Sequence, residues 1–388
     1  MTDLPLTKLA ETASTITLGW TPIPCLGYVL YADGVRRSNS WDPAKSSWKT
    51  NKATEIRVVA LGAAAEGVWP PVIPPPTAQF GADLPVRQKA SPGPVVEVAS
   101  LAALRTAISS GQAGRIVKLT ASIDLGGQDL VINCQGTDVA PITVDLAAPV
   151  SNGRVLISRA AYANVRFIDL GYSPSYDGLK ITDGSHHVDV DGRGGRIHHA
   201  KGQGILVTDP TTRDWQIWNV RIEDVGSETN KDHGIYTATA KGVCVIGNVI
   251  VTNPQAFGFQ FYPDVDSLIC TSCESHGGRT RGGYILGTEY QATKNVKIVG
   301  SIITRTQPTT VAVGTYPPGY VVQGGVVYDS IEWQTSGWGS GMTYEHCVGA
   351  DPAVTAKGFV LPVRYGLHPT HDIDGRPFVT ADAGAVAY

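Results

Sequence analysis

Residues able to do acid–base chemistry gather in the middle of this chain. Lys231, Asp232 and His233 are consecutive, and Arg281 follows further along. A lysine or histidine can remove the proton next to a sugar carboxylate, and an arginine can neutralise that carboxylate. An aspartate can protonate or attack a glycosidic bond. These four residues are therefore candidate catalytic groups for the cleavage of a polysaccharide.

Further polar and aromatic residues have the chemistry to hold a sugar chain. The candidate substrate-binding residues are His199, Asp224, Tyr236, Gln260, Tyr262, His276 and Arg279. Hydrolysis would pair Asp232 with Asp224 or Glu223 as the two carboxylates. Elimination would instead use Lys231 or His233 as the base and Arg279 or Arg281 as the cation. Glycan binding without catalysis, or a simple solvated surface, also fits these residue types.

A repeated glycine is what would bring these residues together. The glycines Gly178, Gly204, Gly234, Gly258 and Gly283 are 26, 30, 24 and 25 residues apart. Each is followed by an apolar residue, and in four of the five cases by another two positions later. This alternation is typical of a half-buried strand, and a repeat of this length is typical of a stacked solenoid.

Two further strand patterns recur between the glycines. One includes Val188–Val190 and Trp215–Ile217, and the other includes Ile197 and Ile222. Three strands in each coil of roughly 25 residues predict an all-β parallel β-helix, and crossover sterics favour the right-handed form. Coils lie about 4.8 Å apart, so side chains two coils apart can straddle a sugar residue. Trp215 and Trp218 are three residues apart, so they cannot both face inward from one strand, and we expect one of them to be exposed.

Three segments are expected along the chain. Residues 1–68 contain alternating strand patterns and should form a small β-sandwich, residues 69–94 are a Pro-rich linker, and residues 95–388 form the β-helix with a C-terminal closing segment. The first segment resembles a shortened fibronectin type III module, with Trp20 at the core position. Ile56 stands where that family usually carries a tyrosine.

The beginning of the third segment has a recognisable order of elements. A strand at residues 95–98 precedes a helix with Ser100 as its N-cap, an apolar stripe through Leu104 and Ile108, and a stop at Gly111. This order resembles the entry of pectate-lyase-like right-handed β-helices, in which the helix caps the open end of the core. Residues 372–388 resemble the closing turn of bacterial β-helix proteins.

Composition excludes several classes of function. The formal net charge of −3 offers no basic field for nucleic acid, and no apolar run is long enough to span a membrane. The six cysteines are scattered, and we interpret Cys270 and Cys273 as inward thiols rather than zinc ligands. We expect no metal and no cofactor. The N-terminus shows no secretory signal pattern.

The combination of a small module, a stiff linker and a β-helix resembles phage minor tail or tailspike-type proteins. This resemblance implies a virion-tail location, host cell-envelope polysaccharide as the ligand, docking to other tail proteins through residues 1–68, and a homotrimer. One alternative is an extracellular bacterial polysaccharide lyase or glycoside hydrolase whose signal peptide has been removed. Another is a purely structural tail or adhesin component without catalysis.

Overall fold

A computed structural model divides the chain into two compact units, Met1–Pro74 and Pro75–Tyr388. The predicted closing segment at 372–388 lies outside the part that the structure describes. The described residues are 2–3, 5–12, 14–21, 27–32, 35–40, 46–51, 56–61, 87–228, 231–289, 292–304, 310–328, 330–333, 335–345 and 347–349.

The first unit contains two antiparallel sheets. One has the order β1 (Thr2–Asp3), β7 (Ile56–Leu61), β4 (Gly27–Ala32), β5 (Val35–Ser40), and the other has the order β2 (Thr7–Glu11), β3 (Thr15–Gly19), β6 (Ser47–Asn51). Trp20 is buried, as are Leu18 and Val58. These sheets are compatible with the expected β-sandwich, while the fibronectin type III resemblance stays a prediction.

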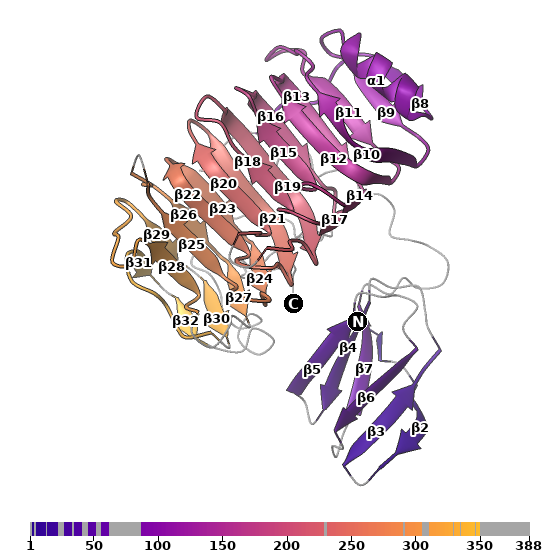
Figure 1. Cartoon of the computed structure of the whole chain (residues 1–388), viewed down its shortest axis with the longest axis vertical. Helices are drawn as coiled ribbons and strands as arrows, with labels where there is room; N and C mark the ends of the chain where they lie inside the picture. The colour runs from indigo at the N-terminus through magenta and orange to yellow at the C-terminus, as the bar shows by residue number, and fades with distance from the viewer. Residues whose placement is uncertain are drawn as a thin grey trace. The chain divides into compact units, whose positions relative to one another are not determined.

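The second unit is an all-β parallel β-helix with a capping helix at its N-terminal end, which confirms the predicted fold class. Figure 1 shows its strands stacked coil upon coil. Its strands form three columns, here called A, B and C, in which each strand pairs in parallel with the equivalent strand of the next coil.

Each column is a series of short strands. Column A consists of β10 (Ile123–Ile132), β12 (Val150–Ser158), β15 (Leu179–Thr182), β18 (Ile205–Val207), β20 (Ile235–Ala240), β22 (Phe259–Val265), β25 (Tyr284–Gly287) and β28 (Val313–Tyr316). Column B consists of β8 (Val95–Val98), β9 (Ile116–Leu119), β11 (Ile142–Leu146), β13 (Ala161–Phe167), β16 (His186–Asp191), β19 (Arg213–Glu223), β21 (Cys244–Thr252), β23 (Leu268–Thr271), β26 (Lys297–Val299), β29 (Val326–Tyr328) and β31 (Thr343–Glu345). Column C consists of β14 (Asp169–Ser173), β17 (Arg196–Ala200), the last residues of β19 and β21, β24 (Glu274–His276), β27 (Ile302–Thr304), β30 (Ile331–Trp333) and β32 (Val348–Gly349).

The repeated glycines stack at the turn that leads from column C into column A, as predicted. The amide of Ile205 donates to the Gly234 carbonyl at 2.9 Å, and the amide of Ile235 donates to the Gly258 carbonyl at 2.9 Å. A Cβ added at Gly178 would lie 2.3 Å from Cγ2 of Ile197, and one at Gly204 would lie 2.4 Å from Cγ2 of Ile222. Glycine is required at these corners because inward column C side chains already fill the space.

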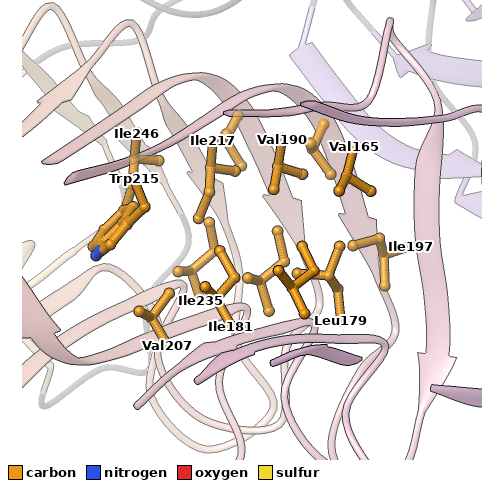
Figure 2. Close-up of a cluster of buried hydrophobic side chains, with 14 of the residues drawn as sticks. Val165, Leu179, Ile181, Val190, Ile197, Val207, Trp215, Ile217, Ile235 and Ile246 are labelled. Atoms are coloured by element: carbon orange, nitrogen blue, oxygen red, sulfur yellow. The ribbon is translucent and has the colours of Figure 1, made fainter. Parts of the chain in front are cut away.

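Inward side chains form continuous apolar ladders. Figure 2 shows Val165, Val190, Ile217 and Ile246 in one row, facing Leu179 and Ile235 across the core. All of these side chains are fully buried. Full burial of one such side chain contributes roughly 1.5–3 kcal/mol, so stacking the coils supplies most of the stability.

Trp215 and Trp218 are both fully buried, so the expectation that one of them is exposed is wrong. Trp215 belongs to the inner ladder. Trp218 faces outward, where its ring lies against Gly247, at 2.0 Å from the position that a Cβ would take there. Its indole Nε1 donates to Gln216 at 2.9 Å. A tryptophan can thus be buried on the outer face when a neighbouring glycine leaves room for its ring.

The N-terminal end of the β-helix is closed by α1 (Leu101–Ser109), and the Ser100 side chain accepts the Ala103 amide as predicted. The preceding residues lie on the outer face of column B. Arg87 donates to Asp189 at 2.9 Å and to Asp191 at 3.0 Å. The last part of the predicted linker is therefore packed onto the β-helix.

The glycine corner gives a testable stability prediction. Gly178→Ala should destabilise the β-helix by about 1–3 kcal/mol, because the new Cβ overlaps Ile197. In a double-mutant cycle with Ile197→Ala, the combined cost should be smaller than the sum of the single costs. The measurement is urea unfolding followed by circular dichroism. Gly314→Ala is the control, since its closest neighbours are 3.3 Å away, and it should cost much less. Strict additivity would contradict the proposed overlap.

Candidate active site

Polar residues form an ordered row on the outer face of column C. Strand alternation buries Ile197 and Ile222 and turns their neighbours outward. Register then aligns one outward residue from each successive coil. This column C row consists of His198, Glu223, Thr252, His276 and Thr304.

A carboxylate and two histidines are connected at one end of the row. Nε2 of His198 lies 2.9 Å from Oδ1 of Asp169, and Nδ1 of His198 lies 2.7 Å from Nδ1 of His199. Although burial acts to raise it, the pKa of Asp169 is lowered by the His198 hydrogen bond and by the charge of Arg196. An ionised Asp169 accepts hydrogen bonds only, so a neutral His198 carries its proton on Nε2.

The proton on Nε2 of His198 determines the tautomer of His199. Nδ1 of His198 becomes an acceptor, so Nδ1 of His199 must donate the proton between them. Nε2 of His199 then carries a lone pair, and the His199 residue is exposed. The backbone of His199 is in the left-handed region, with φ 55°, at the second-last residue of β17. The hydrogen-bonded series Asp169–His198–His199, here called the relay, therefore presents a basic nitrogen, Nε2 of His199, at the edge of column C.

Glu223 lies one coil beyond His198 in the same row. Burial raises the pKa of its carboxyl, the charges of Arg196 and Arg221 oppose that rise, and Asp224 adds to it. The protonated form is thus favoured relative to an ordinary glutamate. Glu223 is a candidate proton donor next to the candidate base.

The other predicted residues of this edge lie near the same row. Arg279 Nη2 is 3.7 Å from Asp224 Oδ1, and Arg279 Nη1 donates to the Gly226 carbonyl at 3.1 Å. His276 contacts Glu274 at 2.5 Å and Thr304 at 2.9 Å. The structure therefore brings four of the predicted substrate-binding residues to the column C side, namely His199, Asp224, His276 and Arg279.

Two of the predicted catalytic residues hold the turn between columns C and A. Asp232 is buried, and its Oδ2 accepts the amides of Ser227 at 2.8 Å and Glu228 at 2.6 Å. His233 Nδ1 accepts the Phe257 amide at 3.2 Å. Burial lowers the pKa of His233 to about 3, which makes it a weak base. Asp232 therefore has structural partners within its own turn, and His233 has one in the turn of the next coil.

These contacts belong to a hydrogen-bond ladder between coils. The Asp177 carboxylate accepts the Gln203 amide at 2.9 Å, and the Gln203 side chain accepts the His233 amide at 2.5 Å. His233 in turn accepts the Phe257 amide. The side chains of Asp177, Gln203 and His233, each directly before a stacked glycine, thus satisfy a backbone donor of the next coil.

The remaining predicted catalytic residues lie in equivalent turns. Lys231 is exposed and pairs with Glu228 at 2.9 Å, which raises its pKa and keeps the amine protonated, so that it is not available as a base. Arg281 is half-buried in the turn before β25. The assignment of Lys231, Asp232, His233 and Arg281 as catalytic stays a prediction. The described contacts of Asp232 and His233 favour a structural role for these two residues.

Tyr236, Gln260 and Tyr262 lie on the outer side of column A. Tyr236 and Gln260 pair in register on adjacent coils. Tyr262 Oη donates to Glu289 at 3.0 Å, and burial followed by this hydrogen bond raises the pKa of Tyr262 to about 12. The structure thus splits the predicted substrate-binding residues between two faces, with the glycine turn between them.

Sequence reasoning missed the partners that complete the column C site. Asp169, Glu274 and Thr304 were not singled out, and Glu223 was considered only as an alternative carboxylate. The available signal was the alternation of Arg196–His198, Arg221–Glu223 and Glu274–His276 around inward residues.

Two solved structures superpose on part of this chain at low sequence identity. No family model matches the chain, and no curated protein matches it. An alginate lyase from Paenibacillus sp. str. FPU-7 superposes with a TM-score of 0.41 and 13% identity, over 66% of this chain and 99% of that protein. The pectate lyase Pel9A superposes with a TM-score of 0.40 and 12% identity, over 73% of this chain and 83% of that protein.

The buried His233 gives a prediction of acid sensitivity. Its pKa is about 3 in the folded chain and about 6.5 when unfolded, so the unfolded chain binds the extra proton between these values. Stability from the neutral ring is present above about pH 6.5 and is lost as the pH falls, by at most about 1.4 kcal/mol per pH unit.

The matched variant is His233→Gln, because Gln203 already fills the equivalent position and its carbonyl oxygen accepts the next amide. The difference in unfolding free energy between wild type and variant should change steadily from pH 7 to pH 4, measured by urea unfolding. If the unfolding free energies of wild type and variant change with pH in the same way, His233 does not take up a proton when the chain unfolds.

Proposed function

We propose that the outer face of column C binds an acidic polysaccharide and cleaves it by β-elimination. The observation that supports this is the Asp169–His198–His199 relay, with Glu223 one coil away. His199 of the relay offers a base and Glu223 offers a proton donor. Elimination needs both groups.

The reaction can be written with these residues. Nε2 of His199 takes the proton from the carbon next to the uronate carboxylate. The electron pair forms the carbon–carbon double bond, and the neighbouring carbon–oxygen glycosidic bond breaks. Glu223 gives its proton to the departing oxygen. Asp169 stabilises the positive charge that develops on the two imidazoles.

Charge and shape on this face suit an anionic polymer. Arg196 precedes His198 by two residues on β17, and about half of its side chain is exposed, so it can neutralise a sugar carboxylate. The row runs from coil to coil, with about 4.8 Å between neighbours. An extended chain can therefore contact several coils at once, as solenoid surfaces commonly allow.

The location of the protein in a virion tail is part of this proposal. Its support is the organisation of the chain, in which a separate unit with two small sheets precedes the β-helix. In this proposal residues 1–68 dock to other tail proteins, the assembly is a homotrimer, and the polysaccharide belongs to the host cell envelope.

Antibody against residues 100–388 should label the tails of purified phage particles in electron micrographs. Bare tails, with the protein found only in the culture medium, would favour a secreted polysaccharide lyase or hydrolase. Activity without either location would leave the tail assignment unsupported.

Elimination is tested with polygalacturonate, alginate and host envelope polysaccharide. The wild type should release UV-absorbing unsaturated uronates from at least one of them. His199→Gln and Glu223→Gln should each lower the rate by about 10²–10⁴-fold. The matched control is His187→Gln, since His187 forms the same Nδ1–Nδ1 contact with His186, at 2.9 Å, in β16 of column B.

The outcomes separate the mechanisms. Equal losses in all three variants would argue against a specific role of the relay. New reducing ends without UV absorbance would replace elimination with hydrolysis.

Glu223 also gives a prediction in which stability and activity change in opposite directions. Because burial raises the pKa of its carboxyl, any stability that the protonated form provides is lost as the pH rises through that pKa. Glu223→Gln should therefore raise the melting temperature at neutral pH while it lowers the rate. The loss of wild-type activity at high pH should also disappear in the variant. A lower melting temperature in the variant would count against a buried, destabilising carboxylate.

A further inference from the structure

A carboxylate, an imidazole and a hydroxyl are connected at the other end of the column C row. Oε2 of Glu274 lies 2.5 Å from Nε2 of His276, and Nδ1 of His276 lies 2.9 Å from Oγ1 of Thr304. The acid–base relay described above uses none of these groups.

Strand geometry holds the three groups in place. Glu274 and His276 are two residues apart on β24, so they project from the same face of the strand. Thr304 is the register partner of His276 on the next coil. The arrangement therefore depends on regular strand pairing rather than on a loop, which keeps the three groups aligned.

Hydrogen-bond chemistry assigns a role to each group. The Glu274 side chain is 4% exposed, and as a carboxylate it accepts the proton on Nε2 of His276. Nδ1 of His276 is then the acceptor that faces the Thr304 hydroxyl. This is the order of orienting acid, base and nucleophile found in hydrolases that form an acyl intermediate.

We propose that Thr304, His276 and Glu274 hydrolyse short acyl esters carried by the polysaccharide. Oγ1 of Thr304 attacks the ester carbonyl carbon while its proton moves to Nδ1 of His276. The sugar oxygen leaves and takes that proton, and an acyl–Thr304 ester remains. A water molecule, deprotonated by His276, then releases the carboxylic acid and restores the hydroxyl.

Two observations define the substrate class. Thr304 is only 4% exposed, so a small acyl group such as acetyl can reach Oγ1 more easily than a long chain. His276 lies two coils from Glu223, which is about 10 Å along the same row. The choice of the polysaccharide as the ester carrier rests on the proposed function, whereas the triad itself does not.

The first experiment uses p-nitrophenyl acetate, a soluble ester that requires no polysaccharide site. The full-length protein should hydrolyse it, and Thr304→Val should lower the rate by at least about 100-fold. Thr304→Ser should keep activity because it keeps the hydroxyl. The matched control is Thr182→Val, since Thr182 is a similarly buried threonine in column A and should be dispensable for ester hydrolysis.

Covalent trapping gives an independent measurement. An alkyl fluorophosphonate should label the wild type at Thr304, as located by peptide mass spectrometry, and His276→Asn should abolish labelling. Each variant should keep the circular dichroism spectrum of the wild type. Equal ester hydrolysis by wild type and Thr304→Val, no hydrolysis by the wild type, or labelling elsewhere would each overturn the proposal.

The two activities of the row can be separated. On an acetylated polyuronate, Thr304→Val should stop acetate release and leave unsaturated uronates unchanged, whereas Glu223→Gln should do the reverse. Hydrolysis of p-nitrophenyl acetate with no elimination would refute the proposed function alone. Loss of both products in both variants would refute two independent sites.

Discussion

Parallel hydrogen bonding between equivalent strands is the interaction on which the rest of the molecule depends. Each strand satisfies its backbone through the coil before and the coil after, so a residue's neighbours are set by its position within the coil. Inward positions become apolar ladders, and outward positions become rows. The relay at His198 and the triad at Thr304 are both consequences of this alignment.

The turns obey the same requirement for satisfied polar groups. Asn219 donates to Asp191 at 3.1 Å and Asn248 donates to Asn219 at 3.2 Å, in a second ladder at the turn between columns B and C. A buried polar group without a partner costs more than a hydrogen bond gains, so such ladders are expected in a stacked fold. Polar residues that repeat from coil to coil are therefore weak indicators of catalysis by themselves.

The difference between polar residues that hold turns and polar residues that could catalyse explains how much could be predicted from the sequence. The glycine spacing and strand alternation were sufficient for the fold class, because each arises from local sterics repeated in every coil. The site was harder, since Asp232 and His233 have catalytic residue types but accept backbone amides of the turn. Asp232 accepts amides of its own turn, whereas the partner of His233, the Phe257 amide, comes from the next coil, and the turn geometry sets both pairings. Trp218 shows the same limit, because the glycine that accommodates it is one coil away.

The attachment of Arg87 affects how the β-helix would respond to mechanical force. Its guanidinium binds Asp189 and Asp191 on the side of column B, some coils beyond the capping helix. Breaking a buried ion pair of this kind typically costs roughly 3–5 kcal/mol. A pull transmitted through the chain before Arg87 would thus load the flank of an inner coil and would have to shear this contact. The terminal strand β8 would be shielded from being peeled away one hydrogen bond at a time.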